Sequence, residues 1–162
     1  MSIAFDAAPL GVPITELAAA NPAVSRRRRV SLLVVEDDRS VRTLLGRALA
    51  GDGVEVSEAP NAAEAERLVA ESCPDLVVAD VVMPGRSGIE LRRELMNLYP
   101  TLPVVLISGY SPEQVAEFAA RTPATSFLPK PFSIAALQQT VNEALEARTR
   151  SADRGVSAEG SG

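Results

Sequence analysis

The sequence predicts an α/β fold in which a parallel five-stranded sheet carries helices on both faces. Five short runs rich in Val, Leu and Ile alternate with segments whose apolar residues recur at helical spacing. Apolar and polar residues do not alternate regularly in these runs, which indicates strands that are buried on both faces. Strands that alternate with helices along a chain form parallel sheets with right-handed crossovers.

The expected strands cover residues 30–35, 54–57, 76–79, 104–107 and 125–128. Five helices are expected to follow them, each starting at a residue whose side chain can accept a hydrogen bond from the first turn. These residues are Asp38, Asn61, Ser87, Ser111 and Ser133. Ser87 with Glu90, and Ser111 with Gln114, have the spacing of capping boxes.

Each expected helix has an apolar stripe that should face the sheet. The stripes are Val41, Leu44, Leu45, Ala48 and Leu49; Ala62, Ala65, Leu68 and Val69; Leu91, Leu95, Leu98 and Tyr99; Val115, Phe118 and Ala119; and Ile134, Leu137, Val141, Ala144 and Leu145.

The chain is expected to hold one folded domain, residues 30–148, between two extensions. Residues 1–29 are rich in Ala and Pro and predict a flexible leader, with a short helix around residues 14–20. The leader ends in a basic run, Arg26 to Arg29, which is either a solvated linker or a contact for an acidic partner. Residues 149–162 are mostly Ser, Gly, Ala and charged residues and predict a disordered tail.

Composition excludes several classes of function. The net charge of −5 disfavours direct binding of nucleic acid. The single cysteine, Cys73, excludes an internal disulfide, and no apolar run is long enough to cross a membrane, so a cytoplasmic protein is expected. The chain has no histidine, so it has no imidazole of its own for acid–base catalysis or metal binding.

Polar side chains follow four of the expected strands at the point where each strand ends. Glu36 and Asp37 follow the first, Asp80 the third, Ser108 the fourth and Lys130 the fifth. The carboxyl ends of parallel strands meet at one edge of a sheet, where ligands bind. Lys130 is the only lysine, and the other basic residues are arginines, which suggests a need for a compact charge.

Three carboxylates at one edge repel one another unless a cation binds them. Mg²⁺ prefers oxygen ligands and keeps several waters, so it suits such a site and leaves positions for a phosphoryl group. Asp80 is then a candidate nucleophile that forms an acyl phosphate. The Lys130 ammonium and the Ser108 hydroxyl would stabilise the phosphoryl oxygens.

Taken singly, each of these residues has a structural explanation. Acids after the first strand can cap a helix, Asp80 can form a turn before Pro84-Gly85, and Ser108 and Lys130 can be ordinary polar residues at strand ends. All of these residues occur together, in the right order and each at the end of the right strand, and this favours the functional interpretation.

From about residue 30 to 147 the sequence resembles the receiver domain of bacterial two-component response regulators. The similarity rests on Leu-Leu-Val-Val-Glu36-Asp37-Asp38, on Val-Val-Ala-Asp80-Val-Val-Met-Pro-Gly, on Ser108 and on Lys130-Pro131-Phe132. Glu36 stands where the family more often has Asp. The resemblance implies a flavodoxin-like strand order 2-1-3-4-5 and a cis Lys130–Pro131 bond.

The resemblance also implies roles for these residues. Glu36, Asp37, Asp80 and the Val82 carbonyl would hold Mg²⁺, Asp80 would be the phosphoacceptor, and Ser108 with Phe127, which could also be a plain core residue, would form the conformational switch.

The implied function is a signalling domain rather than an enzyme in its own right. The phosphoryl group would come from a sensor histidine kinase or a His phosphotransfer protein, and an unidentified downstream protein would recognise the change around the fourth helix, fifth strand and fifth helix. Neither a nucleic acid nor a membrane is expected as a direct partner.

Three alternatives stay open at this point. One is a phosphate sink or relay separated from a hybrid histidine kinase, because Ser108-Gly109-Tyr110-Ser111 resembles receivers of that type. Another is an interaction module on the same fold that is no longer phosphorylated. A phosphohydrolase is the third, but the Asp-x-Asp expected after its first strand is not matched by Glu36-Asp37-Asp38-Arg39.

Overall fold

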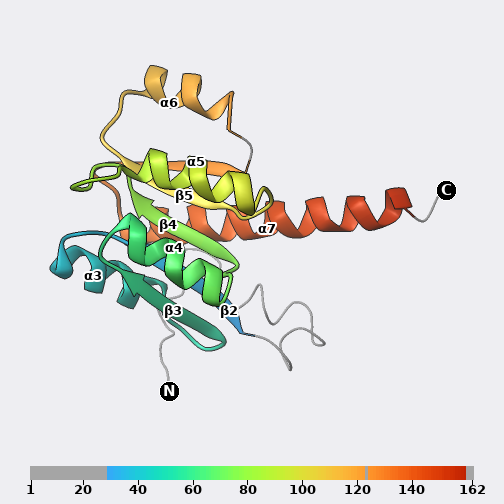
Figure 1. Cartoon of the computed structure of the whole chain (residues 1–162), viewed down its shortest axis with the longest axis horizontal. Helices are drawn as coiled ribbons and strands as arrows, with labels where there is room; N and C mark the ends of the chain where they lie inside the picture. The colour runs from blue at the N-terminus through green and yellow to red at the C-terminus, as the bar shows by residue number, and fades with distance from the viewer. Residues whose placement is uncertain (1–28, 123, 160–162) are drawn as a thin grey trace.

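The fold is built on a five-stranded parallel sheet, seen in the computed structural model of the chain (Figure 1), which describes residues 29–122 and 124–159. The strands are β2 (Val30–Val35), β3 (Val54–Ala59), β4 (Leu76–Asp80), β5 (Val104–Ser108) and β6 (Thr125–Pro129). Their spatial order is β3-β2-β4-β5-β6, and every neighbouring pair is parallel. This is the predicted order 2-1-3-4-5, and the predicted fold class is therefore confirmed.

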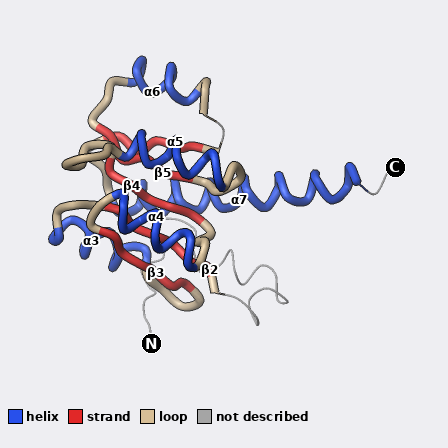
Figure 2. Tube along the Cα trace, viewed as in Figure 1, coloured by secondary structure: helices blue, strands red, loops and turns tan. Residues whose placement is uncertain are grey.

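In the described part of the chain, four helices connect the strands and a fifth follows the last strand (Figure 2). They are α3 (Arg39–Leu49), α4 (Ala62–Glu71), α5 (Gly88–Leu98), α6 (Pro112–Ala119) and α7 (Ile134–Glu159). Helices α3 and α7 cover one face of the sheet, and α4, α5 and α6 cover the other. The sheet is thus covered on both sides, as its uninterrupted apolar strands require.

Two apolar clusters, one on each face of the sheet, make up the core. Alternate residues of a strand point to opposite faces, so Leu32 and Val34 enter the cluster under α3 and α7, while Leu33 and Val35 enter the cluster under α4 and α5. All four are at most 1% exposed. Burial of such side chains stabilises the fold by about 1.5–3 kcal/mol each.

All five helices begin at the predicted capping residues, including α7, where the Ser133 hydroxyl oxygen accepts from the N–H of Ala136 at 3.0 Å. Asp38 accepts from the N–H of Val41, and Asn61 accepts from the N–H of Glu64. The two predicted capping boxes, Ser87 with Glu90 and Ser111 with Gln114, are both present. Each cap contributes on the order of 1 kcal/mol and fixes where the loop before its helix ends.

Some side chains of the predicted apolar stripes do not face the sheet. Val41 and Leu44 of α3 are 38% and 57% exposed, Leu98 is 73% exposed and Ile134 is 40% exposed. The prediction that these four residues point inward is wrong. A stripe at helical spacing is wider than the line along which a helix touches a sheet, so the residues on its margins and at helix ends remain in solvent.

Helix α7 is longer than expected. It was predicted to end near Arg148, but it extends to Glu159 and projects beyond the sheet (Figure 1). Residues 149–159, which were expected to belong to the tail, are helical in the structure. Extending an existing helix needs no new nucleation. The start of the extension carries a hydrogen bond from the Thr149 hydroxyl to the Leu145 carbonyl and an ion pair between Arg150 and Glu146.

The leader and the last residues of the tail lie outside the described residues. This applies to the predicted helix at 14–20, to Arg26 through Arg28, and to residues 160–162. The division of the chain into leader, domain and tail stays a prediction. Within the described part, no helix has the length and apolar character that a membrane span requires.

Candidate functional site

The candidate site lies at the edge of the sheet where the parallel strands end. Asp80 is the last residue of β4 and Ser108 the last of β5, while Glu36 and Lys130 each directly follow a strand. The backbone joins neighbouring members: the N–H of Val81 donates to Ile107 and the N–H of Lys130 donates to Ser108, both at 2.9 Å. The topology therefore delivers the predicted site residues to one place.

Three carboxyl groups form a compact acidic cluster at this edge, consisting of Glu36, Asp37 and Asp80. One oxygen from each lies within 4.8 Å of the others. Glu36 is 4% exposed and Asp80 is 6% exposed, while Asp37 is exposed to solvent. The cluster is thus buried on one side and open to water on the other.

Crowding and burial alter the protonation of Glu36. The pKa of Glu36 is raised from 4.5 to about 7, mainly by burial and in addition by hydrogen bonding to the carboxyl groups of Asp37 and Asp80. The N–H of Asp38, which donates to Glu36 Oε1 at 3.1 Å, acts in the opposite direction. A carboxyl group held this close to two others is relieved by a proton or by a cation.

The acidic cluster fits a hard divalent cation. Its donors are all oxygens, and the exposed side at Asp37 leaves room for the waters that Mg²⁺ retains. Val82 follows Asp80 in the turn after β4, and its N–H donates to Asp80 Oδ1 at 3.2 Å. The predicted metal residues Glu36, Asp37, Asp80 and Val82 are therefore neighbours.

Lys130 reaches the acidic cluster from the end of β6. Its Nζ donates to both oxygens of Asp80, at 3.2 Å each. The Lys130–Pro131 bond is cis, as predicted. The ammonium thus lies against Asp80, where it would also meet any group bonded to that carboxylate.

Ser108 and Phe127 lie beside the acidic cluster rather than in it. Ser108 is 1% exposed, and its hydroxyl oxygen accepts from the N–H of Tyr110 at 2.8 Å. Phe127 is half-buried and contacts Phe118 of α6 edge to face, with 5.5 Å between ring centroids. Phe127 pairs with Leu106, two residues before Ser108, so it links α6 to the strands that end at the site.

Comparison with known proteins identifies the family to which the chain belongs. The response regulator receiver domain family matches residues 32–142, which is more than half of the chain. The chain belongs to this family. Receiver domains are signalling domains of two-component systems, and phosphorylation and Mg²⁺ binding through acidic residues are general to them.

Relatives of this receiver occur within longer proteins. The DNA-binding transcriptional regulator NtrC of Azospirillum brasilense is 38% identical over 119 residues, which covers 74% of this chain and 25% of the relative. Sensor kinase CckA of Brucella abortus is 40% identical over 118 residues, 72% of this chain and 12% of the relative. The chain therefore spans a quarter or less of the length of these curated relatives.

A solved structure gives the same fold. The crystal structure of the receiver domain of NtrX from Brucella abortus has a TM-score of 0.64 and 34% sequence identity, and the match covers 71% of this chain and 98% of that domain. The strand order and the placement of the helices in this receiver thus agree with experimental structures of the family.

Gly88 is a residue of the receiver site that the sequence pattern did not reveal. A Cβ atom at this position would lie 2.3 Å from the carbonyl oxygen of Asp80, so any other residue would push the backbone away. The N–H of Gly88 also donates to Val81 at 2.9 Å. The start of α5 is thereby held against the backbone of Asp80, and the signal for it was a glycine at the first helical position after Ser87.

Proposed function

We propose that this receiver accepts a phosphoryl group on Asp80 from a phosphohistidine of a sensor histidine kinase or a His phosphotransfer protein. The observation that carries the proposal is the ammonium of Lys130 at 3.2 Å from both Asp80 oxygens, beside two further carboxylates. Because the chain has no histidine, the phosphohistidine belongs to the partner.

The chemical step is a transfer from nitrogen to oxygen. An Asp80 oxygen bonds to phosphorus while the bond from phosphorus to the partner's imidazole nitrogen breaks, and that nitrogen keeps the electron pair. Bound Mg²⁺, held by Glu36, Asp37, Asp80 and the Val82 carbonyl, would supply charge neutralisation for the phosphoryl oxygens. Lys130 supplies a second positive charge, and its contacts with Asp80 keep the attacking carboxylate in place.

The signal would spread through Ser108 and Phe127. A phosphorylated Asp80 gains negative charge and strong hydrogen-bond acceptors, so the Ser108 hydroxyl exchanges its bond with the Tyr110 N–H for one to the phosphoryl group. Phe127 then moves into the vacated space, and its contact with Phe118 transmits the change to α6. Downstream proteins would recognise the surface of α6, β6 and α7.

Three proposals about context remain distinct. A single-domain regulator that acts through protein contacts is the first candidate. A phosphate sink or relay separated from a hybrid kinase is the second, supported by the 40% identity to a sensor kinase. An interaction module without phosphorylation is the third, and the complete set of site residues at one edge argues against it.

The acyl phosphate is expected to be long-lived. The side chain of Val82 is 70% exposed at the site but apolar, so it cannot orient an attacking water. Tyr110, 37% exposed, lies two residues after Ser108, and its ring would partly cover the phosphorylated Asp80. A phosphate lifetime of seconds in the purified protein would contradict this part of the proposal.

The proposal is tested by incubating the protein with Mg²⁺ and acetyl phosphate and following its mass. We expect the mass of one phosphoryl group to be added, and hydroxylamine to remove it, as it does for acyl phosphates. The Asp80→Asn variant should stay unlabelled under the same conditions. Failure of the unsubstituted protein to take up phosphate, or to bind beryllofluoride with Mg²⁺, would favour the interaction module instead.

A further inference from the structure

We infer that Arg42 of α3 is a positioning residue for the acid pair Glu36-Asp37, which it holds through the backbone. Its guanidinium donates one N–H to the carbonyl oxygen of Glu36 at 2.8 Å, and the same nitrogen lies 3.5 Å from the carbonyl oxygen of Asp37. The inference rests on the proposed function, because the acid pair matters as part of a Mg²⁺ site.

The carbonyl groups that Arg42 contacts lie where the strand pairing stops. The last bond between this segment and β3 is the one from the N–H of Glu36 to Ala59, at 3.1 Å. Beyond it the backbone turns toward α3, and its carbonyl groups need partners other than a strand. The side chain of Arg42, only 16% exposed, supplies such a partner.

Glu58 of β3 fixes the guanidinium from the other side. Its Oε1 lies 3.4 Å from Arg42 Nε. Glu58 also passes close over α3, where residue 46 is a glycine: a Cβ atom there would lie 3.2 Å from Glu58 Oε2. A planar guanidinium can bind a carboxylate on one edge and a carbonyl on another at the same time, which a lysine ammonium does not reproduce.

The held backbone in turn fixes the carboxylates. The N–H of Asp38 donates to Glu36 Oε1 at 3.1 Å, and Asp38 itself caps α3 through the N–H of Val41. Arg42 lies one turn further, with its own N–H bonded to the Asp38 carbonyl at 2.9 Å. The Glu36 carboxylate is thus held by the N–H of Asp38, and the backbone of Glu36 and Asp37 is held by the Arg42 guanidinium, so a metal ion would meet an acid pair whose backbone is already in place.

The inference predicts that Arg42→Met weakens Mg²⁺ binding. Loss of a residue that orients metal ligands typically lowers metal affinity by about 10-fold or more, and we expect the Mg²⁺ dissociation constant, measured by calorimetry, to rise by about 10-fold. Arg67→Met is the matched control, because Arg67 is also paired with glutamates, Glu64 and Glu71, but on the exposed face of α4. It should bind Mg²⁺ like the unsubstituted protein.

Two further measurements separate positioning from charge and from the metal. Arg42→Lys retains the positive charge but not the planar guanidinium that binds two acceptors at once. This variant should therefore bind Mg²⁺ nearly as weakly as Arg42→Met. In the metal-free protein, hydrogen exchange of the backbone amides of residues 36–38 should accelerate in Arg42→Met and not in Arg67→Met. The Gly46→Ala variant displaces Glu58 without removing Arg42, and should shift both readouts in the same direction by less.

The outcomes are decisive in different ways. An Arg42→Met protein that binds Mg²⁺ as tightly as the Arg67→Met protein would overturn the inference, and so would full recovery in Arg42→Lys, since charge alone would then suffice. If the unsubstituted protein failed to bind Mg²⁺, the proposed function would fall, while the exchange of amides 36–38 would still test whether Arg42 holds this turn.

Discussion

Glu36 is a residue whose protonation links the site to the stability of the fold. Its pKa is raised from 4.5 to about 7 by burial and by neighbouring carboxyl groups. Between these values the folded protein binds more protons than the unfolded chain, so the free energy of unfolding is highest below pH 4.5 for this group and falls as pH rises through 7. We expect the metal-free protein to lose about 3 kcal/mol from this source between pH 5 and 8, at about 1.4 kcal/mol per pKa unit.

Urea unfolding in the presence of a chelator at several pH values measures this loss. The chain has no histidine, so no imidazole contributes to the slope. Glu36→Gln should flatten the profile, whereas Glu94→Gln on α5 should leave most of it, although the pKa of Glu94 is also raised, first by its hydrogen bond with Glu66. Saturating Mg²⁺ should also reduce the slope, because the ion replaces the proton. A profile that rises with pH in the metal-free protein would contradict the assignment.

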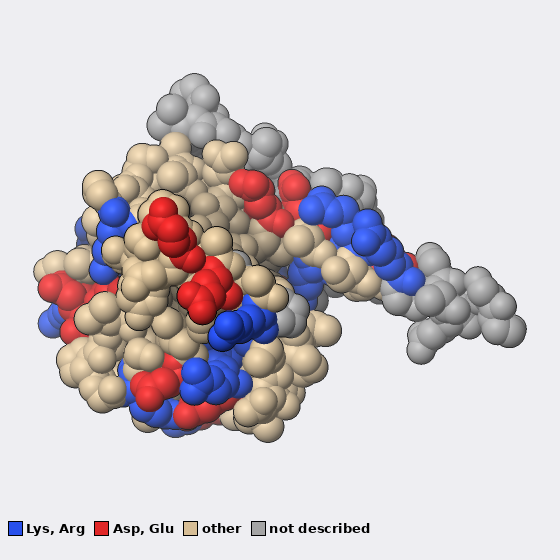
Figure 3. Space-filling model, turned by 90° about the horizontal axis from the view of Figure 1, so that it is seen from above, with Lys and Arg blue, Asp and Glu red and all other residues tan. Residues whose placement is uncertain are grey.

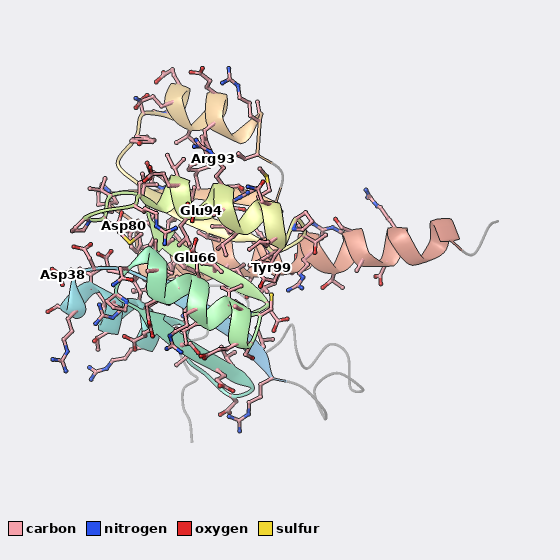
Figure 4. All side chains as sticks on the ribbon, in the orientation of Figure 1. Asp38, Glu66, Asp80, Arg93, Glu94 and Tyr99 are labelled. Carbon is pink, nitrogen blue, oxygen red and sulfur yellow. The ribbon has the colours of Figure 1, made fainter. Side chains whose placement is uncertain are left out.

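At the level of elements, the loop between β4 and α5 is tied to two helices by Arg86. The Arg86 guanidinium donates to both oxygens of Glu66 on α4 at 2.8 Å, and it also bonds Glu94 on α5. Figure 4 shows Glu66 and Glu94 on adjacent helices, close to the strand that ends in Asp80. One arginine thus joins α4, α5 and the loop that contains Val82.

A double-mutant cycle tests whether this link is energetic. The side chains of Arg86 and Glu66 are 36% and 34% exposed, so solvent screens their attraction, and we expect a coupling of about 0.5–1 kcal/mol between Arg86→Met and Glu66→Gln in the free energy of unfolding. The coupling should shrink at high salt. Arg93→Met, at an exposed neighbouring position of α5, should show no coupling with Glu66→Gln.

The elements show which features a sequence can predict. Helix starts were predicted because their signals are local: Ser87 and Glu90 are three residues apart, and their reciprocal bonds form within one turn. Strand ends were predicted less precisely, since β3 ends two residues later than expected, and β4, β5 and β6 each end one residue later. The buried faces of the helices were predicted less well. Leu44 and Leu45 are adjacent leucines on α3, and the sequence does not distinguish them. Leu45 is buried and Leu44 is 57% exposed because of where the sheet lies relative to the helix.

The candidate site likewise contains residues that the sequence predicts and residues that it does not. Glu36, Asp80 and Lys130 were predictable because a parallel sheet brings the ends of its strands together, whatever the rest of the chain does. Arg42 and Gly88 were not predicted, because their importance depends on tertiary contacts. No spacing rule tells that Arg42 reaches the carbonyl of Glu36, or that the space for a Cβ at residue 88 is taken by the backbone of Asp80.

Across the whole molecule, the core is confined to one continuous stretch of the chain. Every buried residue in the described part lies between Leu32 and Leu145. Beyond Leu145, α7 extends into solvent, and in Figure 3 basic side chains form a row along this projecting part, with acidic ones nearby. Arg148 ties α7 to the body of the domain, because its guanidinium donates to the carbonyl of Asp75 at 2.8 Å.

This distribution predicts that a chain shortened to end at residue 150 retains the stability of the whole. Removing solvent-exposed turns deletes no buried apolar group, so urea unfolding should give a free energy within about 0.5 kcal/mol of the full chain. Arg148→Met in the full chain should cost more, about 1–2 kcal/mol, because it strips a bond from Asp75, which also accepts from the N–H of Ser31 at 2.8 Å. A large loss in the shortened chain would instead show that the end of α7 packs against the domain, since only residues 151–162 differ.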